Sequence, residues 1–161
     1  MIYDTLPPGW YTDAELWLLE ACARAAPDHP FVEIGVAQGR SAHVLARYAH
    51  ELHLVDDLSM GDFRATWPLA ATYTAVEDMV HRVPLIGLLH HDADHTYGPV
   101  RDHLELLLPK VALHGCVCLH DFVGNSYPGV SRAWSMATWQ TKTMWKSIGA
   151  EGSLACFERL A

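Results

Sequence analysis

Short apolar runs alternate along this chain with segments of helical spacing, and this alternation constrains the fold more than any other feature. The apolar runs lie at residues 31–34, 52–55, 85–91 and 115–119. Strands that alternate with helices favour a mainly parallel sheet with helices packed on its faces. The run at 85–91 is apolar almost throughout, as expected of a strand that is buried on both sides. The sequence therefore predicts an α/β sandwich.

The other elements follow from capping and turn residues. Thr12 or Asp13 can cap a first helix that ends before Pro27. Two runs at 144–148 and 154–159 predict a closing antiparallel hairpin. The remaining predicted elements are helices over about 41–49, 62–71, 96–108 and 129–139, a strand over 73–76 and a helical turn to residue 81.

The chain has the size and organisation expected of one domain. Its 161 residues contain no internal repeat and no linker-like segment. We therefore expect a single domain over 1–161, with a lead-in and a helix over 1–30 and the α/β core over 31–161.

The acidic charge excludes one class of partner. Lys and Arg number 11 against 19 Asp and Glu, so the formal charge is −8 with histidine neutral. Binding to a phosphate backbone depends on basic side chains that displace counterions, so we expect no nucleic-acid partner. No apolar run has the length of a membrane span, and the N-terminus lacks a basic segment followed by an apolar one. The chain is predicted to be cytoplasmic, with no membrane partner.

The four cysteines have no metal-binding spacing. Cys22, Cys116, Cys118 and Cys156 include no C-x-x-C pair. Cys116 and Cys118 alternate along an apolar run, so we expect both on one face of a strand as small apolar side chains. In a cytoplasmic protein these thiols stay reduced.

Polar residues collect where the predicted strands end. The segment 35–39 follows the first strand, and Asp56 and Asp57 follow the second. The segments 91–95 and 120–121 follow the next two apolar strands. Open α/β sheets bind ligands beyond the carboxyl ends of their strands. These residues are therefore expected to form one site.

The loop after the first strand predicts the kind of ligand. The dinucleotide fingerprint G-x-G-x-x-G fails, because Ala37 and Arg40 occupy its second and third glycine positions. Glu33, two positions before Gly35, suits a ligand with a positive amino group rather than a pyrophosphate. Asp56 lies 21 residues after Gly35, where a carboxylate can accept both hydroxyl protons of a ribose. Together these features favour an adenosine-type ligand over a plain tight turn.

At this point the sequence resembles the class I S-adenosylmethionine-dependent methyltransferases, and it is most similar to the small-molecule branch called methyltransferase family 24. The resemblance extends over about 31–134 and implies a Rossmann-like three-layer sandwich. It further implies a mainly parallel seven-stranded sheet in the order 3-2-1-4-5-7-6 with a C-terminal antiparallel hairpin. The segments that carry it are EIGVAQGRS at 33–41, LVDD at 54–57, HHDADHTY at 90–97, LHDF at 119–122 and PGVSRAW at 128–134.

The resemblance implies an S-adenosylmethionine-dependent enzyme that methylates an oxygen of a small molecule such as a sugar or secondary metabolite. The methionine end of the cofactor would lie at the first loop, the ribose at Asp56, adenine near residues 75–77, and the sulfonium and acceptor at Asp92. The implied cofactor-binding residues are Glu33, Gly35, Ala37, Gly39, Ser41, Asp56 and Asp92. The chain departs from the family pattern at Gly98 and His114, and its segment between Asp57 and Leu85 is shorter than usual.

Six of the 11 histidines lie between His90 and His120, and they allow several chemistries. His95 or His120 can act as a general base toward a hydroxyl acceptor. Alternatively, Asp92 and Asp121 can hold Mg²⁺ or another divalent cation that lowers the pKa of the acceptor. The catalytic candidates are Asp92, His95 and His120, and the metal candidates are Asp92 and Asp121.

Some of these polar residues also have plain structural interpretations. Asp94 can cap the helix that begins near Thr96, and His90 is expected to be a core histidine rather than a ligand.

Two other functions stay open. One is a metal-dependent hydrolase, because HHDADH superficially resembles the H-x-H-x-D-H motif of the metallo-β-lactamase family. Asp92, however, stands where the second histidine of that motif belongs. The other is an adenosine-cofactor-binding domain without activity. A small-molecule acceptor is the expected partner, bound by residues 1–12, 57–72 and 122–130 or by a second subunit of a homo-oligomer.

Overall fold

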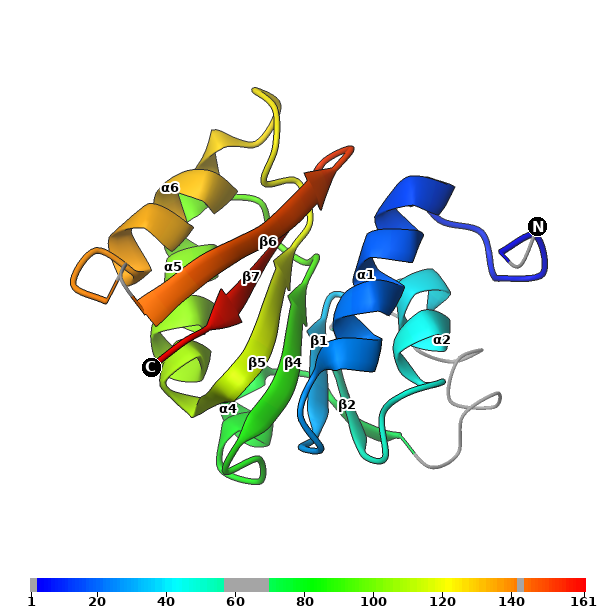
Figure 1. The fold of residues 1–161 in the computed structure, drawn as a ribbon, viewed down its shortest axis with the longest axis horizontal. Helices are drawn as coiled ribbons and strands as arrows, with labels where there is room; N and C mark the ends of the chain where they lie inside the picture. The colour runs from blue at the N-terminus through cyan, green and yellow to red at the C-terminus, as the bar shows by residue number, and fades with distance from the viewer. Residues whose placement is uncertain (1–2, 57–69, 142–143) are drawn as a thin grey trace.

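The computed structural model describes residues 3–56, 70–141 and 144–161. The strands within these residues form one seven-stranded sheet in the order β3-β2-β1-β4-β5-β7-β6 (Figure 1). Helices cover both faces of the sheet, so the molecule has three layers. The predicted fold class and strand order are confirmed.

The first five strands in sequence run parallel, and the last two run antiparallel. The parallel strands are β1 (Phe31–Ile34), β2 (Leu52–Val55), β3 (Ala71–Tyr73), β4 (Ile86–His91) and β5 (Val111–Leu119). The hairpin strands β6 (Trp145–Glu151) and β7 (Leu154–Arg159) follow, and β7 pairs with β5. The predicted bounds of β1, β2 and β7 are confirmed.

The helices are short, and most lie where the sequence predicts them. They are α1 (Asp13–Ala25), α2 (Arg40–Leu45), α4 (Val76–Val80), α5 (Tyr97–Leu107), the 3₁₀ turn η1 (Leu108–Lys110) and α6 (Pro128–Ala137). Thr12 caps α1 through a reciprocal pair of bonds, since its hydroxyl accepts from the Glu15 amide and its own amide donates to the Glu15 carboxylate.

Three strands differ from their predicted bounds by more than one residue. β6 covers residues 145–151 rather than 144–148, because it pairs with β7 as far as Glu151. β3 covers residues 71–73 rather than 73–76, because it pairs with β2 and its ladder ends where β2 ends. β5 begins at Val111 rather than Gly115. Its early part was hidden because the strand shifts register against β4 there and passes through His114 at a φ of 62°. The predicted helix over 62–71 lies almost entirely outside the described residues.

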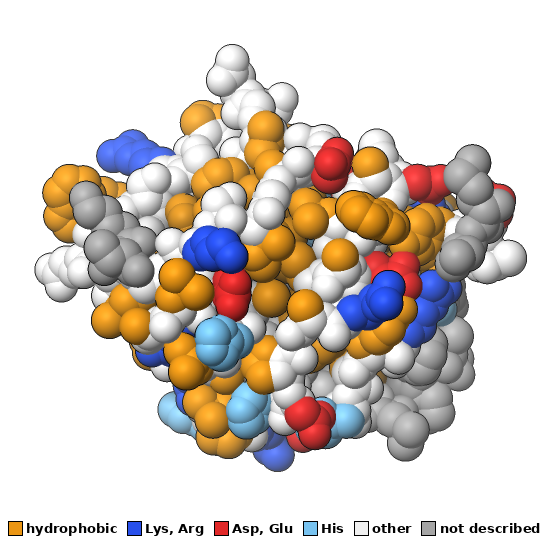
Figure 2. All heavy atoms as spheres, viewed as in Figure 1, with side chains coloured by type: hydrophobic (Ala, Val, Ile, Leu, Met, Phe, Trp, Pro, Cys, Tyr) orange, Lys and Arg blue, Asp and Glu red, His pale blue; other side chains and the backbone are white. Residues whose placement is uncertain are grey.

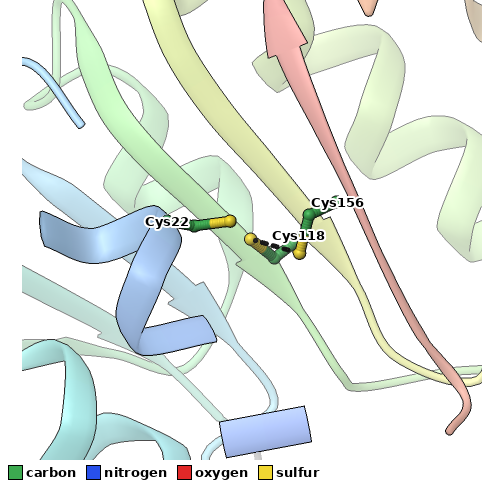
Figure 3. A group of neighbouring side chains, drawn as sticks. All are labelled: Cys22, Cys118 and Cys156. Carbon is green, nitrogen blue, oxygen red and sulfur yellow. Dashed lines mark hydrogen bonds between the residues drawn. The ribbon is translucent and has the colours of Figure 1, made fainter. Parts of the chain in front are cut away.

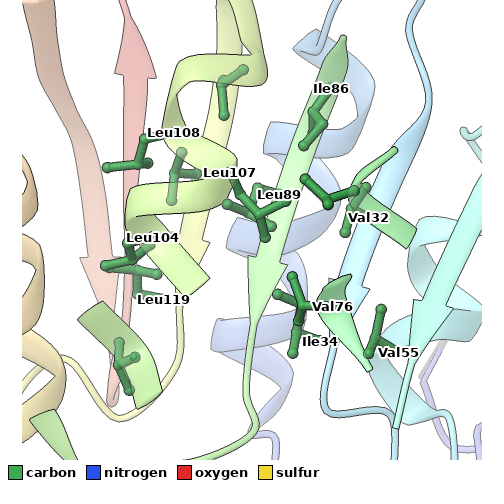
Figure 4. Packing of buried hydrophobic residues seen from close by; sticks show 14 of the residues in the cluster. Val32, Ile34, Val55, Val76, Ile86, Leu89, Leu104, Leu107, Leu108 and Leu119 are labelled. Atoms are coloured by element: carbon green, nitrogen blue, oxygen red, sulfur yellow. The ribbon is translucent and has the colours of Figure 1, made fainter. Parts of the chain in front are cut away.

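Each face of the sheet has its own apolar core. On one face, the leucines of α5 and residues of α4 and α6 pack on alternate residues of β1, β4 and β5 (Figure 4). On the other face, α1 and α2 pack on the intervening residues, including Leu88, Cys116 and Cys118. Cys116 and Cys118 therefore share a strand face as predicted.

The hairpin lies beside α1 on the face seen in Figure 2, where apolar side chains occupy much of the middle between scattered charged ones. Here Glu15 Oε1 accepts hydrogen bonds from the amide of Ser153 at 2.7 Å and from its hydroxyl at 3.0 Å. These bonds fix the first helix to the turn between the last two strands. Among the described residues, no helix is long and apolar enough to cross a membrane.

His91 makes the fold sensitive to acid. Its side chain is buried, and its Nε2 lies 3.1 Å from Nδ1 of His103. Burial, with a smaller contribution from His103, lowers the pKa of His91 to about 3. An unfolded histidine titrates near pH 6.5, so between these values the unfolded state binds the extra proton and the fold loses stability as the pH falls.

We therefore expect the free energy of unfolding to fall by about 2 kcal/mol from this residue alone between pH 7.5 and pH 5.0. Urea unfolding followed by circular dichroism at the two pH values measures it. His91→Gln, which has no titrating group, should lose that part of the pH dependence. An equal loss in His91→Gln and wild type would contradict the assignment.

Candidate active site

A cavity of about 1390 Å³ opens at the carboxyl ends of the parallel strands. It is lined by residues 34–38 after β1, by Asp56 after β2, by residues 92–95 after β4 and by His120 and Asp121 after β5. The structure thus brings together the polar strand ends that the sequence predicts at one edge. Residues 74–77 and the lead-in residues 8–11 complete much of the wall.

The loop after β1 depends on a glycine at its first position. Gly35 has a φ of 84°, and a Cβ placed on it would lie 2.2 Å from the carbonyl oxygen of Asp92. The backbone of this loop therefore passes directly against the end of β4. Gly39 also has a positive φ, 82°, and precedes the first residue of α2.

Asp56, at the end of β2, holds the same loop by hydrogen bonds to its backbone. Its Oδ2 accepts hydrogen bonds from the amides of Val36 at 2.7 Å and Ala37 at 2.8 Å. The carboxylate predicted to bind a ribose is thus fixed in direction by two backbone donors. Since both Asp56 and Ala37 line the cavity, a ligand there can contact both the carboxylate and the loop that the carboxylate holds.

Glu33 lies behind this wall rather than on it. Its side chain is fully buried, and Glu33 is not among the described residues that line the cavity. Gly39 does not line the cavity either. Glu33 Oε1 accepts a hydrogen bond from the Ser41 hydroxyl and lies 3.0 Å from His90 Nδ1. Of the predicted cofactor residues, Gly35, Ala37, Ser41, Asp56 and Asp92 do line the cavity.

His90 links Glu33 to the cavity through Tyr11. The histidine is buried as predicted, but its ring is bonded at both nitrogens, with Nε2 2.8 Å from the Tyr11 hydroxyl. Tyr11 also donates to Asp92 Oδ2 at 2.9 Å. Burial, reinforced by Asp92 and Glu33, raises the pKa of Tyr11, so its hydroxyl stays protonated as a donor.

His120 stands between two carboxylates. Its buried Nδ1 lies 3.1 Å from Asp92 Oδ1 and 3.3 Å from Asp121 Oδ2, without the alignment of a hydrogen bond to either. Its Nε2 lies 3.1 Å from the Ser153 hydroxyl and 3.6 Å from Glu15 Oε1. These contacts place an imidazole in a ring of acidic and hydroxyl groups.

Asp92 and His120 shift each other's pKa. Burial opposes the charged form of His120, but Asp92 and then Asp121 outweigh it and raise its pKa. Burial likewise opposes the charge of Asp92, but His120 outweighs it and lowers the Asp92 pKa. Each partner therefore favours the charged form of the other, a carboxylate at Asp92 and an imidazolium at His120.

His95 is the more accessible histidine. Its side chain is 35% exposed and lines the cavity, and its Nε2 lies 2.7 Å from Asp121 Oδ2. The ring also packs against Tyr127, with centroids 4.3 Å apart. An acceptor entering the cavity can reach His95 more directly than the enclosed His120.

A divalent cation fits this cluster. Asp92, His95 and Asp121 each offer one ligand atom, and the three atoms lie within 4.8 Å of one another. The two carboxylate oxygens suit Mg²⁺, and the imidazole nitrogen also suits a softer divalent ion such as Zn²⁺ or Fe²⁺. The buried Nδ1 of His120, which lacks a well-aligned hydrogen bond, marks the same acidic pocket.

A family model supplies the deciding comparison. The model of a methyltransferase domain, methyltransferase family 24, matches residues 32–122, more than half of the chain. The chain belongs to this family. Its matched part contains the loop after β1, Asp56, and the ends of β4 and β5.

Solved structures show the same fold in other methyltransferases. A putative O-methyltransferase from Klebsiella pneumoniae is 16% identical with a TM-score of 0.72, covering 97% of this chain and 84% of that one. An O-methyltransferase from Bacillus cereus in complex with SAH is 12% identical with a TM-score of 0.70, covering 96% and 84%. CalS11, a TDP-rhamnose 3'-O-methyltransferase of calicheamicin biosynthesis, is 16% identical with a TM-score of 0.70, covering 89% and 78%. A search of curated protein sequences gives no significant match.

The lead-in 1–12 was expected at the acceptor pocket, and its residues 8–11 do line the cavity, but no role was predicted for Tyr11, and Glu15 and Ser153 were missed. Tyr11 lies in an irregular lead-in, Glu15 has the spacing of a capping residue, and Ser153 lies in a hairpin turn. None belongs to a motif, so no local signal points to the site. Asp94 does not cap α5 as predicted, because the N-cap residue is Thr96 and no side chain bonds to the first amides of the helix. Its carboxylate instead accepts from the amide and hydroxyl of Thr96, both at 2.5 Å, just before the helix begins.

The contact at Gly35 gives a stability prediction. Gly35→Ala combines an unfavourable φ with a collision against backbone, so we expect a loss of about 2 kcal/mol or more in the free energy of unfolding. Gly98→Ala is the matched control, because nothing lies within 4 Å of its added Cβ and it lies in α5. It should be neutral or stabilising by up to about 1 kcal/mol. Chemical unfolding measures both, and an unharmed Gly35→Ala would show that the loop can move away from β4.

Proposed function

We propose that this protein transfers a methyl group from S-adenosylmethionine to a hydroxyl oxygen of a small molecule. The observation that carries the proposal is that one cavity contains both the Gly35 loop with Asp56 and the cluster of Asp92, His95 and Asp121. The first group suits an adenosine ligand, and the second can handle a proton. Membership of the methyltransferase family and the fold shared with O-methyltransferases support it.

The cavity residues fit this cofactor. S-adenosylmethionine, when bound, supplies an electrophilic methyl group on a positively charged sulfonium. The loop at 35–38 would contact its methionine end, Asp56 its ribose, and residues 74–77 its adenine. The carboxylates of Asp56 and Asp92 give the cavity the negative charge that favours a cationic ligand.

His95 is the proposed general base. Asp121 beside Nε2 favours the proton on that nitrogen, which leaves Nδ1 to accept the proton of an acceptor hydroxyl. His120, held between Asp92 and Asp121, has the positioning role of keeping both carboxylates in place. Tyr127 and the exposed Trp10 offer flat apolar surfaces at the cavity for the ring of a sugar or phenol.

A second candidate for the cluster is the divalent cation site formed by Asp92, His95 and Asp121, favoured by the convergence of their ligand atoms. When bound, a cation would lower the pKa of the acceptor hydroxyl. If Nε2 of His95 ligated a cation, the ring proton would lie on Nδ1, which then could not act as the base, so the two candidates make different predictions.

The ribose assignment is tested by Asp56→Ala. Without this carboxylate, the ribose hydroxyls lose their acceptor and the Val36 and Ala37 amides lose theirs, so we expect at least about a 30-fold loss of affinity for S-adenosylhomocysteine. Isothermal titration calorimetry measures it. Asp102→Ala, on the exposed side of α5, should bind as wild type. Unchanged affinity in Asp56→Ala would refute the assignment.

The base assignment is tested by His95→Gln. After an acceptor is found by screening hydroxylated sugars and phenols, we expect the variant to lose about 10²- to 10⁴-fold in kcat and to keep its affinity for S-adenosylhomocysteine. His81→Gln, remote from the cavity lining, is the control. We expect turnover to survive EDTA. Activity that disappears in EDTA and returns with Mg²⁺ would instead assign His95 as a ligand.

A further inference from the structure

Three cysteine thiols converge in the core on the side of the sheet covered by α1. Cys22 comes from α1, Cys118 from β5 and Cys156 from β7 (Figure 3). Their sulfurs all lie within 4.8 Å of one another, and each side chain is at most 2% exposed. None of the three lines the cavity of the candidate active site. The methyltransferase reaction therefore gives no reason for their convergence.

Two of these thiols already have the arrangement that a disulfide needs. Cys118 and Cys156 face each other directly across the antiparallel pair of β5 and β7. Directly opposed residues have Cα atoms about 4.5–5.5 Å apart, inside the range of about 4.4–6.8 Å found for disulfides. The sulfurs are 3.1 Å apart, so they need to approach by only about 1 Å to reach the bond length of about 2.05 Å.

The pair can also supply the reactive form of a thiol. The shared hydrogen bond between the sulfurs, more than burial, raises the pKa of Cys118 and lowers that of Cys156. Whichever of the two sulfurs loses its proton, its neighbour 3.1 Å away can donate a hydrogen bond to it, and a thiolate is the species that attacks an oxidant.

We propose that Cys118 and Cys156 form a reversible disulfide when the protein meets a peroxide. Cys156 gives up its proton to solvent, its thiolate attacks one peroxide oxygen, and the O–O bond breaks. The leaving hydroxide takes up one proton from solvent, so a sulfenic acid and one water form. The Cys118 sulfur then attacks the sulfenic sulfur and releases the second water. Two thiols thus lose two electrons and two protons in total, and hydrogen peroxide is reduced to two waters.

A disulfide suits this location better than a bound metal. Around the thiols lie apolar side chains of the same core, including Leu18, Leu19, Leu88 and Leu154. Three thiolates around a divalent cation would leave a net negative charge in this apolar core, whereas a disulfide is neutral. Cys22, within reach of both sulfurs, can exchange into the disulfide, which moves the bond without reducing it, and a small external thiol supplies the two electrons that restore the free pair.

The experiment uses the folded, reduced protein and hydrogen peroxide. After oxidation to completion, the sample is quenched in acid, unfolded and treated with a maleimide, and free thiols are counted by intact mass. We expect two of the four thiols to be lost, a Cys118–Cys156 linked peptide in a non-reducing digest, and full recovery with dithiothreitol. The oxidised protein should also gain roughly 5 °C or more in Tm.

Matched variants separate the pair from its neighbours. Cys116→Ala changes a buried cysteine of the same strand and should oxidise as wild type, whereas Cys118→Ala should form no intramolecular disulfide. If Cys118→Ala does not fold, the test is whether the Cys118–Cys156 linked peptide appears in the digests of oxidised wild type and oxidised Cys116→Ala. Four free thiols after oxidation, or a main linkage through Cys22, would overturn the proposal. The proposal would also be overturned if Cd²⁺ bound to the reduced protein with the ultraviolet absorption of metal thiolates and protected Cys22, Cys118 and Cys156 from the maleimide.

Discussion

The parallel pairing of β1 with both β2 and β4 is the constraint on which the rest of the site depends. Ile34 pairs with Val55 on one side and with His91 on the other, so the three strands end side by side. The next residues, Gly35, Asp56 and Asp92, must then share one edge of the sheet. The crowded approach of the Gly35 backbone to Asp92 is a direct result of this register.

The carboxylates at this edge are held by contacts with an opposite charge and with hydrogen-bond donors of the protein. Asp92 keeps its charge in a largely buried position because Tyr11 and His120 contact its two oxygens. Asp56 is aimed by backbone amides. Groups fixed in this way need little rearrangement when a cationic ligand enters, which is the electrostatic preorganisation that transfer of a charged group requires.

Much of the fold could be predicted because its central strands are continuous apolar runs that stop at Gly35 and Asp56. β3 could not be placed, since its half-buried residues have no such pattern and its position is set by β2. At the site, the residues that follow strands were found because topology alone brings them together. The lead-in 1–12 was placed at the pocket, but the role of Tyr11 and the whole of Ser153 were missed, because their contacts join residues about 80 and 138 positions apart.

The bond between Glu15 and the Ser153 turn has a consequence for biosynthesis. One partner lies in the first helix and the other in the last hairpin, so no partly synthesised chain that lacks the hairpin can complete the surroundings of His120. A ribosome-bound chain can therefore build the central strands and the Gly35 loop while the proton-handling side of the cavity is still missing.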